Sequence, residues 1–206
     1  MDHDILINRL RISFGVRGTA RDWIDSFIRK RTQMVNYNGQ TSTSSDIECG
    51  VPQGSLLDTI LFLLYTADVP NIVQQHELSS HTYANDTQLY AHCKAQSCQE
   101  TAVKVTECIK DIDRWMSSNL LKLNGDKTQF IWPGTWQQLA KVQCSTIRIG
   151  DVNIRMSTQV TCLGVVLDSE IKLTRHVRRL AGRCLCYLRQ LWAVRRSVTA
   201  DVAKHW

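Results

Sequence analysis

Apolar residues recur at helical spacing near the start and in the middle of the chain. They predict a helix over residues 4–14 and a second helix from Thr19. Thr19 and Asp22, three residues apart, resemble a capping box at the start of the second helix. A long apolar run predicts a third helix, with Ser55 as its N-cap, that continues towards Asp68.

The clearest helical stripe follows Ser97, whose spacing from Glu100 predicts another capping box. Its apolar positions step by four and three: Cys98, Ala102, Val105, Ile109, Ile112 and Met116. A last helix is expected over residues 172–196. Its apolar seam has the same spacing and consists of Leu173, Val177, Leu180, Cys184, Leu188 and Leu191.

Strand patterns lie between these helices. Residues 33–37 have β-branched and aromatic character, and the following Asn38-Gly39 pair predicts a tight hairpin. Two short strands, 81–83 and 87–92, flank a turn expected at Asn85-Asp86. Further short strands are predicted at 128–132, 146–149, 152–154 and 161–168. Helices and strands alternate without a strict βαβ rhythm or an internal repeat, so the predicted fold class is α+β.

Composition is that of an ordinary globular protein. The 206 residues are 43% hydrophobic and 21% charged, which excludes collagen-like, low-complexity and wholly disordered chains. No apolar run approaches the roughly 20 residues of a membrane span, and Asp2 and Asp4 stand where a signal peptide needs a cationic and then an apolar stretch. We therefore expect an intracellular protein, nuclear or cytoplasmic and not secreted, with no membrane partner.

The eight cysteines include no Cys-x-x-Cys pair. His92, Cys93 and Cys98 form the nearest approach to a metal-binding cluster, but buried free cysteines explain the pattern more simply than zinc does.

Positive charge is concentrated at the end of the chain. Residues 172–206 hold nine Lys or Arg and one acid, a net charge of +8, whereas residues 1–171 have a net charge of −2. Arg175, Arg179 and Arg183 form a ladder at i+4 spacing on one face of the predicted last helix. Such a face suits the phosphates of a polyanion, and a merely solvated helix face explains the charge equally well.

Two motif segments carry most of the functional information. The first is Cys49-Gly-Val-Pro-Gln-Gly-Ser-Leu-Leu57, and the second is Tyr83-Ala-Asn-Asp-Thr-Gln-Leu-Tyr90. Three further segments agree with the same pattern and stand in the expected order along the chain: Asp2-His-Asp-Ile-Leu6, Leu123-Asn-Gly-Asp-Lys-Thr128 and Leu163-Gly-Val-Val-Leu-Asp168. Together they resemble the palm of a reverse transcriptase from the non-LTR (LINE-type) retrotransposons.

The resemblance implies a polymerase palm-like antiparallel sheet packed on helices over residues 1–143. Residues 144–206 would supply small strands and a basic, thumb-like helical region. The implied activity is RNA-directed DNA synthesis, a nucleotidyl transfer that uses Mg²⁺, an RNA template, a DNA primer and deoxynucleoside triphosphates. It also suggests that the chain belongs to a longer retrotransposon polyprotein.

The resemblance assigns roles to individual residues, each beside a plainer alternative. Gln53, Gly54 and Ser55 would line the nucleotide and template side of the palm, although Ser55 is also an ordinary helix cap. Tyr83 belongs to the hairpin motif, and strand tyrosines commonly just pack. Lys127 would lie near the triphosphate, or it is a surface turn lysine. Arg175, Arg179 and Arg183 would contact the nucleic-acid backbone.

The sequence departs from the family pattern at the implied metal site. Asn85 replaces the first aspartate of the family's Tyr-Ala-Asp-Asp turn, so Asp86 is left as the hairpin's metal ligand. The other family carboxylate would precede Met1. Asp2 and Asp4 are conceivable surrogates, but they are more simply the N-terminal charges of the first helix.

A further departure is Asp58-Thr59, where the family has Gly-Pro. We therefore expect a catalytically impaired reverse transcriptase fragment with a degenerate active site. A non-catalytic nucleic-acid-binding relic and a protein-interaction fragment are the alternatives.

Overall fold

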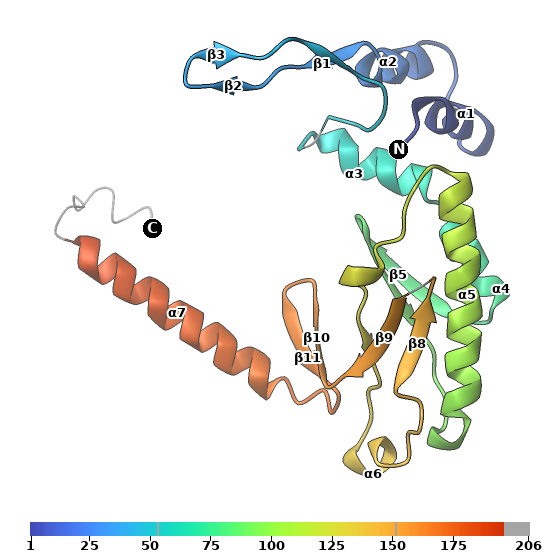
Figure 1. Cartoon of the computed structure of the whole chain (residues 1–206), viewed down its shortest axis with the longest axis vertical. Helices are drawn as coiled ribbons and strands as arrows, with labels where there is room; N and C mark the ends of the chain where they lie inside the picture. Colours follow the sequence, from blue (N-terminus) through green and yellow to red (C-terminus); the bar gives the residue numbers. More distant parts are fainter. Residues whose placement is uncertain (53, 151, 196–206) are drawn as a thin grey trace. The chain divides into compact units, whose positions relative to one another are not determined.

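The computed structural model describes residues 1–52, 54–150 and 152–195 (Figure 1). These residues form two compact units. The first consists of residues 1–127 with 148–152, and the second takes up the rest from residue 128. The observed mixture of helices and small sheets, nearly all antiparallel, confirms the coarse α+β prediction. The functional domains 1–143 and 144–206 stay a prediction.

The first unit begins with two helices. Helix α1 is His3–Ser13, and Asp2 caps it because its Oδ1 accepts the amide hydrogen of Ile5 at 2.9 Å. Helix α2 is Gly18–Ile28, and its N-cap Arg17 makes no side-chain capping bond. The capping box predicted at Thr19 and Asp22 is therefore wrong, because the helix already includes Thr19.

An exposed arm follows α2. Strands β1, Arg31–Gln33, and β4, Ser45–Ile47, pair antiparallel, and β2, Asn36–Tyr37, pairs with β3, Gln40–Thr41. The predicted Asn38-Gly39 hairpin is confirmed, since both residues adopt the positive φ angles, 50° and 77°, that this turn requires.

The predicted apolar helix from Ser55 is two helices, α3, Leu56–Tyr65, and α4, Val69–Gln75. The chain turns between them at residues 66–68, and Pro70 in the first turn of α4 supplies no helical N–H. By length and hydropathy alone, residues 56–75 meet the criterion for a membrane span, contrary to the expectation that no apolar stretch is long enough. In the structure each of the two helices has residues buried against other parts of the first unit.

Strands β5, Ser79–Tyr83, and β6, Asp86–Tyr90, form the next hairpin. The short helix η1, Ala95–Ser97, leads into α5, Cys98–Ser118, and the first unit continues to η2, Gly125–Lys127. Four of the six predicted stripe positions on α5 are buried, and Val105 and Met116 pack partly buried beside them. The capping box at Ser97 is wrong, because its hydroxyl donates to the Lys94 carbonyl instead.

Two hydrophobic cores are found among the described residues of the first unit. In one, α1, α2 and α3 bury Leu6, Ile7, Leu10, Ile28, Leu61 and Tyr65. In the other, α4, the residue before β5 and α5 bury Val69, Val73, Leu78, Cys108 and Ile112. Because α3 belongs to the first core and α4 to the second, the turn at residues 66–68 links the two.

Arg9 of α1 lies close to that turn. Its side chain is only 12% exposed and pairs with Asp68 at 3.1 Å. It donates to the Tyr65 carbonyl and, at 3.0 Å, to Asn119 Oδ1. Its guanidinium carbon lies 5.0 Å from the centre of the Trp115 ring. Arg9 therefore ties α1 to the ends of α3 and α5.

The second unit contains β7, Phe130–Ile131, and α6, Trp136–Leu139. It also contains most of β9, Val152–Ser157, and part of β8, Thr146–Ile149. β9 lies between β7 and β8 in a three-stranded sheet. The single strand predicted over 161–168 is wrong: a turn at Leu163-Gly164, both at positive φ, divides it into β10, Gln159–Cys162, and β11, Val165–Asp168.

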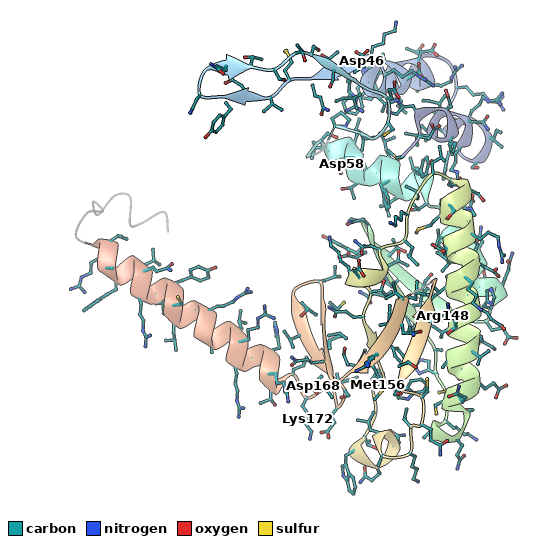
Figure 2. The ribbon with its side chains drawn as sticks, in the orientation of Figure 1. Asp46, Asp58, Arg148, Met156, Asp168 and Lys172 are labelled. Carbon is teal, nitrogen blue, oxygen red and sulfur yellow. The ribbon has the colours of Figure 1, made fainter. Side chains whose placement is uncertain are left out.

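The predicted last helix is present as α7, Thr174–Val194, and its start is tied to β11. His176 Nδ1 accepts the Val166 amide hydrogen at 3.3 Å, and Asp168 Oδ1 accepts that of Lys172 at 3.0 Å. Asp168 and Lys172 are labelled in Figure 2. No residue of α7 is buried, and its apolar seam is exposed along its length. Residue 196, the end of the predicted helix, lies outside the described residues.

Candidate active-site hairpin

The second motif segment forms the β5–β6 hairpin. Tyr83 pairs with Asp86 across the strands, so the two-residue turn consists of Ala84 and Asn85 and not, as predicted, of Asn85 and Asp86. Ala84 adopts a φ of 53°, a left-handed conformation that is uncommon for alanine. Asp86 is therefore the first residue of strand β6, immediately after the turn.

All three motif side chains of this hairpin are accessible. Tyr83 is 63% exposed, and Asn85 and Asp86 are both exposed. Tyr83 does not pack into a core, unlike the strand tyrosine of the plainer alternative. The hairpin therefore presents an aromatic ring, an amide and one carboxylate to solvent.

The first motif segment ends at the start of α3. Gly54 has a φ of 79°, and its amide donates to Oδ2 of Asp58, at 3.0 Å. Figure 2 labels Asp58 at the start of α3. Ser55 is the N-cap, and its hydroxyl oxygen accepts the Asp58 amide hydrogen at 3.1 Å. Asp58, one of the departures from the family pattern, thus bonds through its side chain and its amide to the two residues that precede α3. Gln53 lies outside the described residues.

Gly50 in the same segment is held from two sides. The His3 ring and the Arg31 guanidinium both approach its carbonyl oxygen at 2.7 Å. A carbonyl only accepts hydrogen bonds, so Nε2 of the buried His3 must carry a proton. Sequence reasoning missed these two supports, because they lie 47 and 19 residues from Gly50 and no local pattern marks them.

The remaining predicted residues lie on other elements. Lys127 ends η2, is exposed, and its amide donates to Asn124 Oδ1 at 3.2 Å. Arg175, Arg179 and Arg183 are exposed on α7, where Arg175 donates to Gln159 at 3.1 Å. Among the described contacts, no hydrogen bond or ion pair joins Tyr83, Asn85 or Asp86 to Gly54, Ser55 or Lys127. The predicted roles of all these residues stay predictions.

The side chains present do not make up a metal centre. Divalent magnesium favours oxygen ligands with negative charge, and Asp86 is the one carboxylate at the hairpin turn. No group of three or more His, Cys, Asp or Glu among the described residues is arranged to hold a metal ion. Asp2 caps α1, and Asp4 pairs with Arg29, whose hydrogen bond holds the pKa of the Asp4 carboxyl below its usual value.

Comparison with known proteins assigns the chain that carries this hairpin to a family. The family model described as reverse transcriptase (RNA-dependent DNA polymerase) matches residues 1–167. The chain therefore belongs to the reverse transcriptase family.

The relatives narrow this to one branch, the RNA-directed DNA polymerases of non-LTR retrotransposons, as the motifs predicted. The chain is 27% identical over 203 residues to the probable RNA-directed DNA polymerase from transposon BS of Drosophila melanogaster, covering 96% of this chain and 22% of that protein. It is 25% identical over 162 residues to the RNA-directed DNA polymerase from mobile element jockey of the same fly. That match covers 76% of this chain and 17% of the jockey protein.

A probable RNA-directed DNA polymerase from transposon X-element, again of Drosophila melanogaster, is 24% identical, covering 89% of this chain and 18% of that protein. The chain thus spans about a fifth of the length of the curated relatives it matches. No solved structure matches it.

Proposed function

We propose that this chain is a palm segment of a non-LTR reverse transcriptase whose nucleotide-adding site is impaired at Asn85. The observation that carries the proposal is the β5–β6 hairpin, which has one carboxylate, Asp86, beside a neutral amide in a chain that matches the family. The family reaction, with its RNA template, DNA primer, deoxynucleoside triphosphates and Mg²⁺, is the one that the segment would serve.

The impairment follows from charge. An amide oxygen carries no net charge, and the cation affinity of an oxygen site rises with the number of charged ligands. Asn85 keeps nearly the size and shape of aspartate while removing one negative charge from the turn. Asp86 alone compensates a divalent cation poorly, and Lys127 would lack a bound triphosphate to contact.

Terbium luminescence tests the impairment directly. Tb³⁺ is a hard cation that emits when a nearby tyrosine is excited, and Tyr83 lies opposite Asp86 in the strand pairing. The Asn85→Asp variant should bind Tb³⁺ at least about tenfold more tightly than wild type. Asn85→Asp combined with Asp86→Asn restores the wild-type charge count and is the matched control.

Primer extension on an RNA template gives the second readout. We expect no extension by the wild-type chain in the presence of Mg²⁺. Wild-type extension at the rate of Asn85→Asp would show that Asn85 does not impair the site. Equal Tb³⁺ binding by the two proteins would refute the charge argument even if neither extended a primer.

A second candidate function is non-catalytic binding of nucleic acid by α7. The exposed arginine ladder favours it, because Arg179 and Arg183 form no ion pair among the described contacts and stay available for phosphates. In this case α7 has the thumb-like role expected from the sequence. Changing the three ladder arginines to alanine should reduce the slope of log affinity against log salt by about 2 to 3. An unchanged slope would remove α7 from the binding surface.

A further inference from the structure

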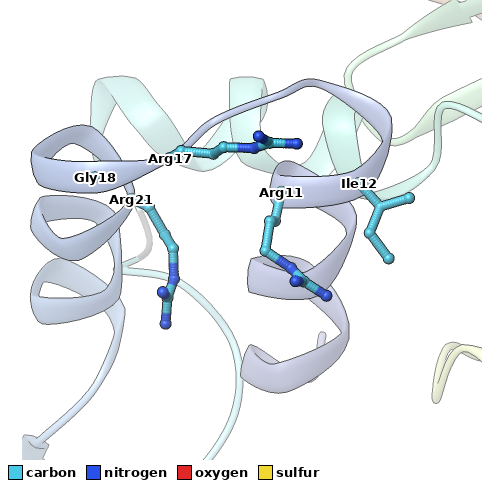
Figure 3. A pocket seen from close by; sticks show the side chains of 5 residues that line it. All are labelled: Arg11, Ile12, Arg17, Gly18 and Arg21. Atoms are coloured by element: carbon cyan, nitrogen blue, oxygen red, sulfur yellow. The ribbon is translucent and has the colours of Figure 1, made fainter.

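A basic pocket lies between the end of α1 and the start of α2 (Figure 3). Arg11 and Ile12 line it from α1, and Arg17, Gly18 and Arg21 line it from α2. Its volume of about 630 Å³ falls in the range of ligand sites and exceeds what one small ion needs. Three guanidinium groups therefore border one open hollow, apart from every motif residue discussed above.

The positive charge of this pocket is not neutralised by acids. Residues 11–21 contain three arginines and no Asp or Glu. Arg11 donates to the neutral Asn8 Oδ1 at 3.0 Å, and Arg17 and Arg21 form no ion pair among the described contacts. Arg29 after the other end of α2 differs, since it pairs with both Asp4 and Asp25. Three neighbouring positive charges repel one another, and an anion bound among them would offset that repulsion.

The backbone at the pocket adds to this charge. Arg17 is the N-cap of α2 but has no side-chain acceptor to offer, so the first amide groups of the helix lack a side-chain cap. Gly18 has a φ of 56°, and apart from its chain neighbours and the backbone of its own helix no described atom lies within 4 Å of the position that a Cβ would take. A ligand thus has open access to the beginning of the helix, where the macrodipole favours negative charge.

We propose that this pocket binds phosphate groups of a nucleic-acid backbone. Arginine forks match phosphate oxygens bidentately, and residues from two helices suit successive phosphates better than a single ion. Ile12, 67% exposed, offers an apolar surface beside them for a sugar ring. The proposal rests on the proposed function, because a reverse transcriptase segment must hold nucleic acid. A free nucleoside triphosphate shares the phosphate chemistry and is the other possible source.

Salt-dependent binding of a short fluorescein-labelled DNA duplex tests the pocket. The variant Arg11→Gln, Arg17→Gln, Arg21→Gln removes its charge at exposed positions, so the fold should persist, as circular dichroism would check. The matched control Lys30→Gln, Lys94→Gln, Lys110→Gln removes three exposed charges from the same unit. Ile12→Glu places a carboxylate in the intact pocket, and Ile12→Gln controls for its size.

We expect the pocket variant to lose about 2 to 3 from the slope of log affinity against log salt, and roughly 10- to 100-fold in affinity at about 0.15 M salt. The lysine control should lose less than about 1 from the slope. Ile12→Glu should weaken binding roughly tenfold, with Ile12→Gln unchanged. A pocket variant that binds like the lysine control would overturn the proposal.

A competition arm separates the two sources of phosphate. Wild type and the pocket variant are titrated with a deoxynucleoside triphosphate alone. If the variant loses triphosphate binding but keeps duplex binding, the pocket takes the free nucleotide and the backbone assignment is wrong. Neither arm measures nucleotide addition or metal binding, so failure here leaves the Asn85 proposal standing, and failure of the Asn85 proposal leaves this one standing.

Discussion

Replacing Arg9 with methionine should destabilise the first unit by about 3 kcal/mol. The side chain makes two charge-assisted hydrogen bonds, to the Tyr65 carbonyl and Asn119, of the kind that contribute about 1.5–3 kcal/mol each. Loss of the cation–π contact with Trp115 costs about 0.5–1 kcal/mol more. These contributions overlap. Asp68 is 46% exposed, so water takes over much of its lost pairing.

Urea unfolding of the full chain measures this cost. A loss of about 3 kcal/mol should appear as a lower midpoint at unchanged slope, and as a fall of about 6–12 °C in Tm. Arg11→Met is the matched control, because this exposed arginine two positions along α1 makes a hydrogen bond to Asn8 and no ion pair among the described contacts, and should change stability by less than about 0.5 kcal/mol. Arg9→Lys should fall between them, since lysine keeps the charge but lacks the fork.

One result would refute this reasoning. If Arg9→Met lies within about 1 kcal/mol of Arg11→Met, the network around Arg9 does not tie α1 to the remainder of the unit. A double-mutant cycle with Asp68→Asn would then measure how much of the remaining cost belongs to that pair.

Three further outcomes are expected. The hydrogen bond from His76 holds the pKa of Asp111 below its ordinary value. This carboxylate therefore stabilises the fold above its unfolded pKa of about 4, and the stabilisation is lost as the pH falls through the lower folded pKa. Asp111→Asn should make the stability measured by urea unfolding fall less steeply as the pH is lowered. Ser55→Ala should cost about 1 kcal/mol in the same assay by removing the α3 cap, and an unchanged midpoint would contradict the capping role. Burial raises the pKa of the Cys108 thiol to about 11, so iodoacetamide at pH 8 should modify exposed Cys186 and spare Cys108 in peptide mapping, whereas equal modification would show that α5 opens readily.

Sequence reasoning succeeded where the determining interactions are local. The stripe on α5 was predictable because one apolar face must pack, and the Asn38-Gly39 turn because its positive φ angles select those residue types. It failed at two helix starts, although the predicted Ser55 cap of α3 is present. Ser97 and Thr19 have side chains suited to capping, but Ser97 bonds back to Lys94 and α2 begins before Thr19.

The candidate site shows the same division. The order of the motif segments identified the family and its hairpin, because strand pairing and a two-residue turn are encoded within a dozen residues. The supports of Gly50 by His3 and Arg31 were not predictable, since each joins residues far apart in sequence. Comparing the net charge of residues 1–171 with that of residues 172–206 also concealed the pocket arginines, which lie in the longer segment with its net charge of −2.

The arm formed by β1 to β4 has a consequence for how the first unit moves. None of residues 31–47 is buried, and none belongs to either core. Its strands are held by short ladders of hydrogen bonds, so its amide hydrogens should exchange with solvent through local opening. Exchange in the middle of α5 instead requires a core to open. We therefore expect the arm to open and re-form many times while both cores stay folded.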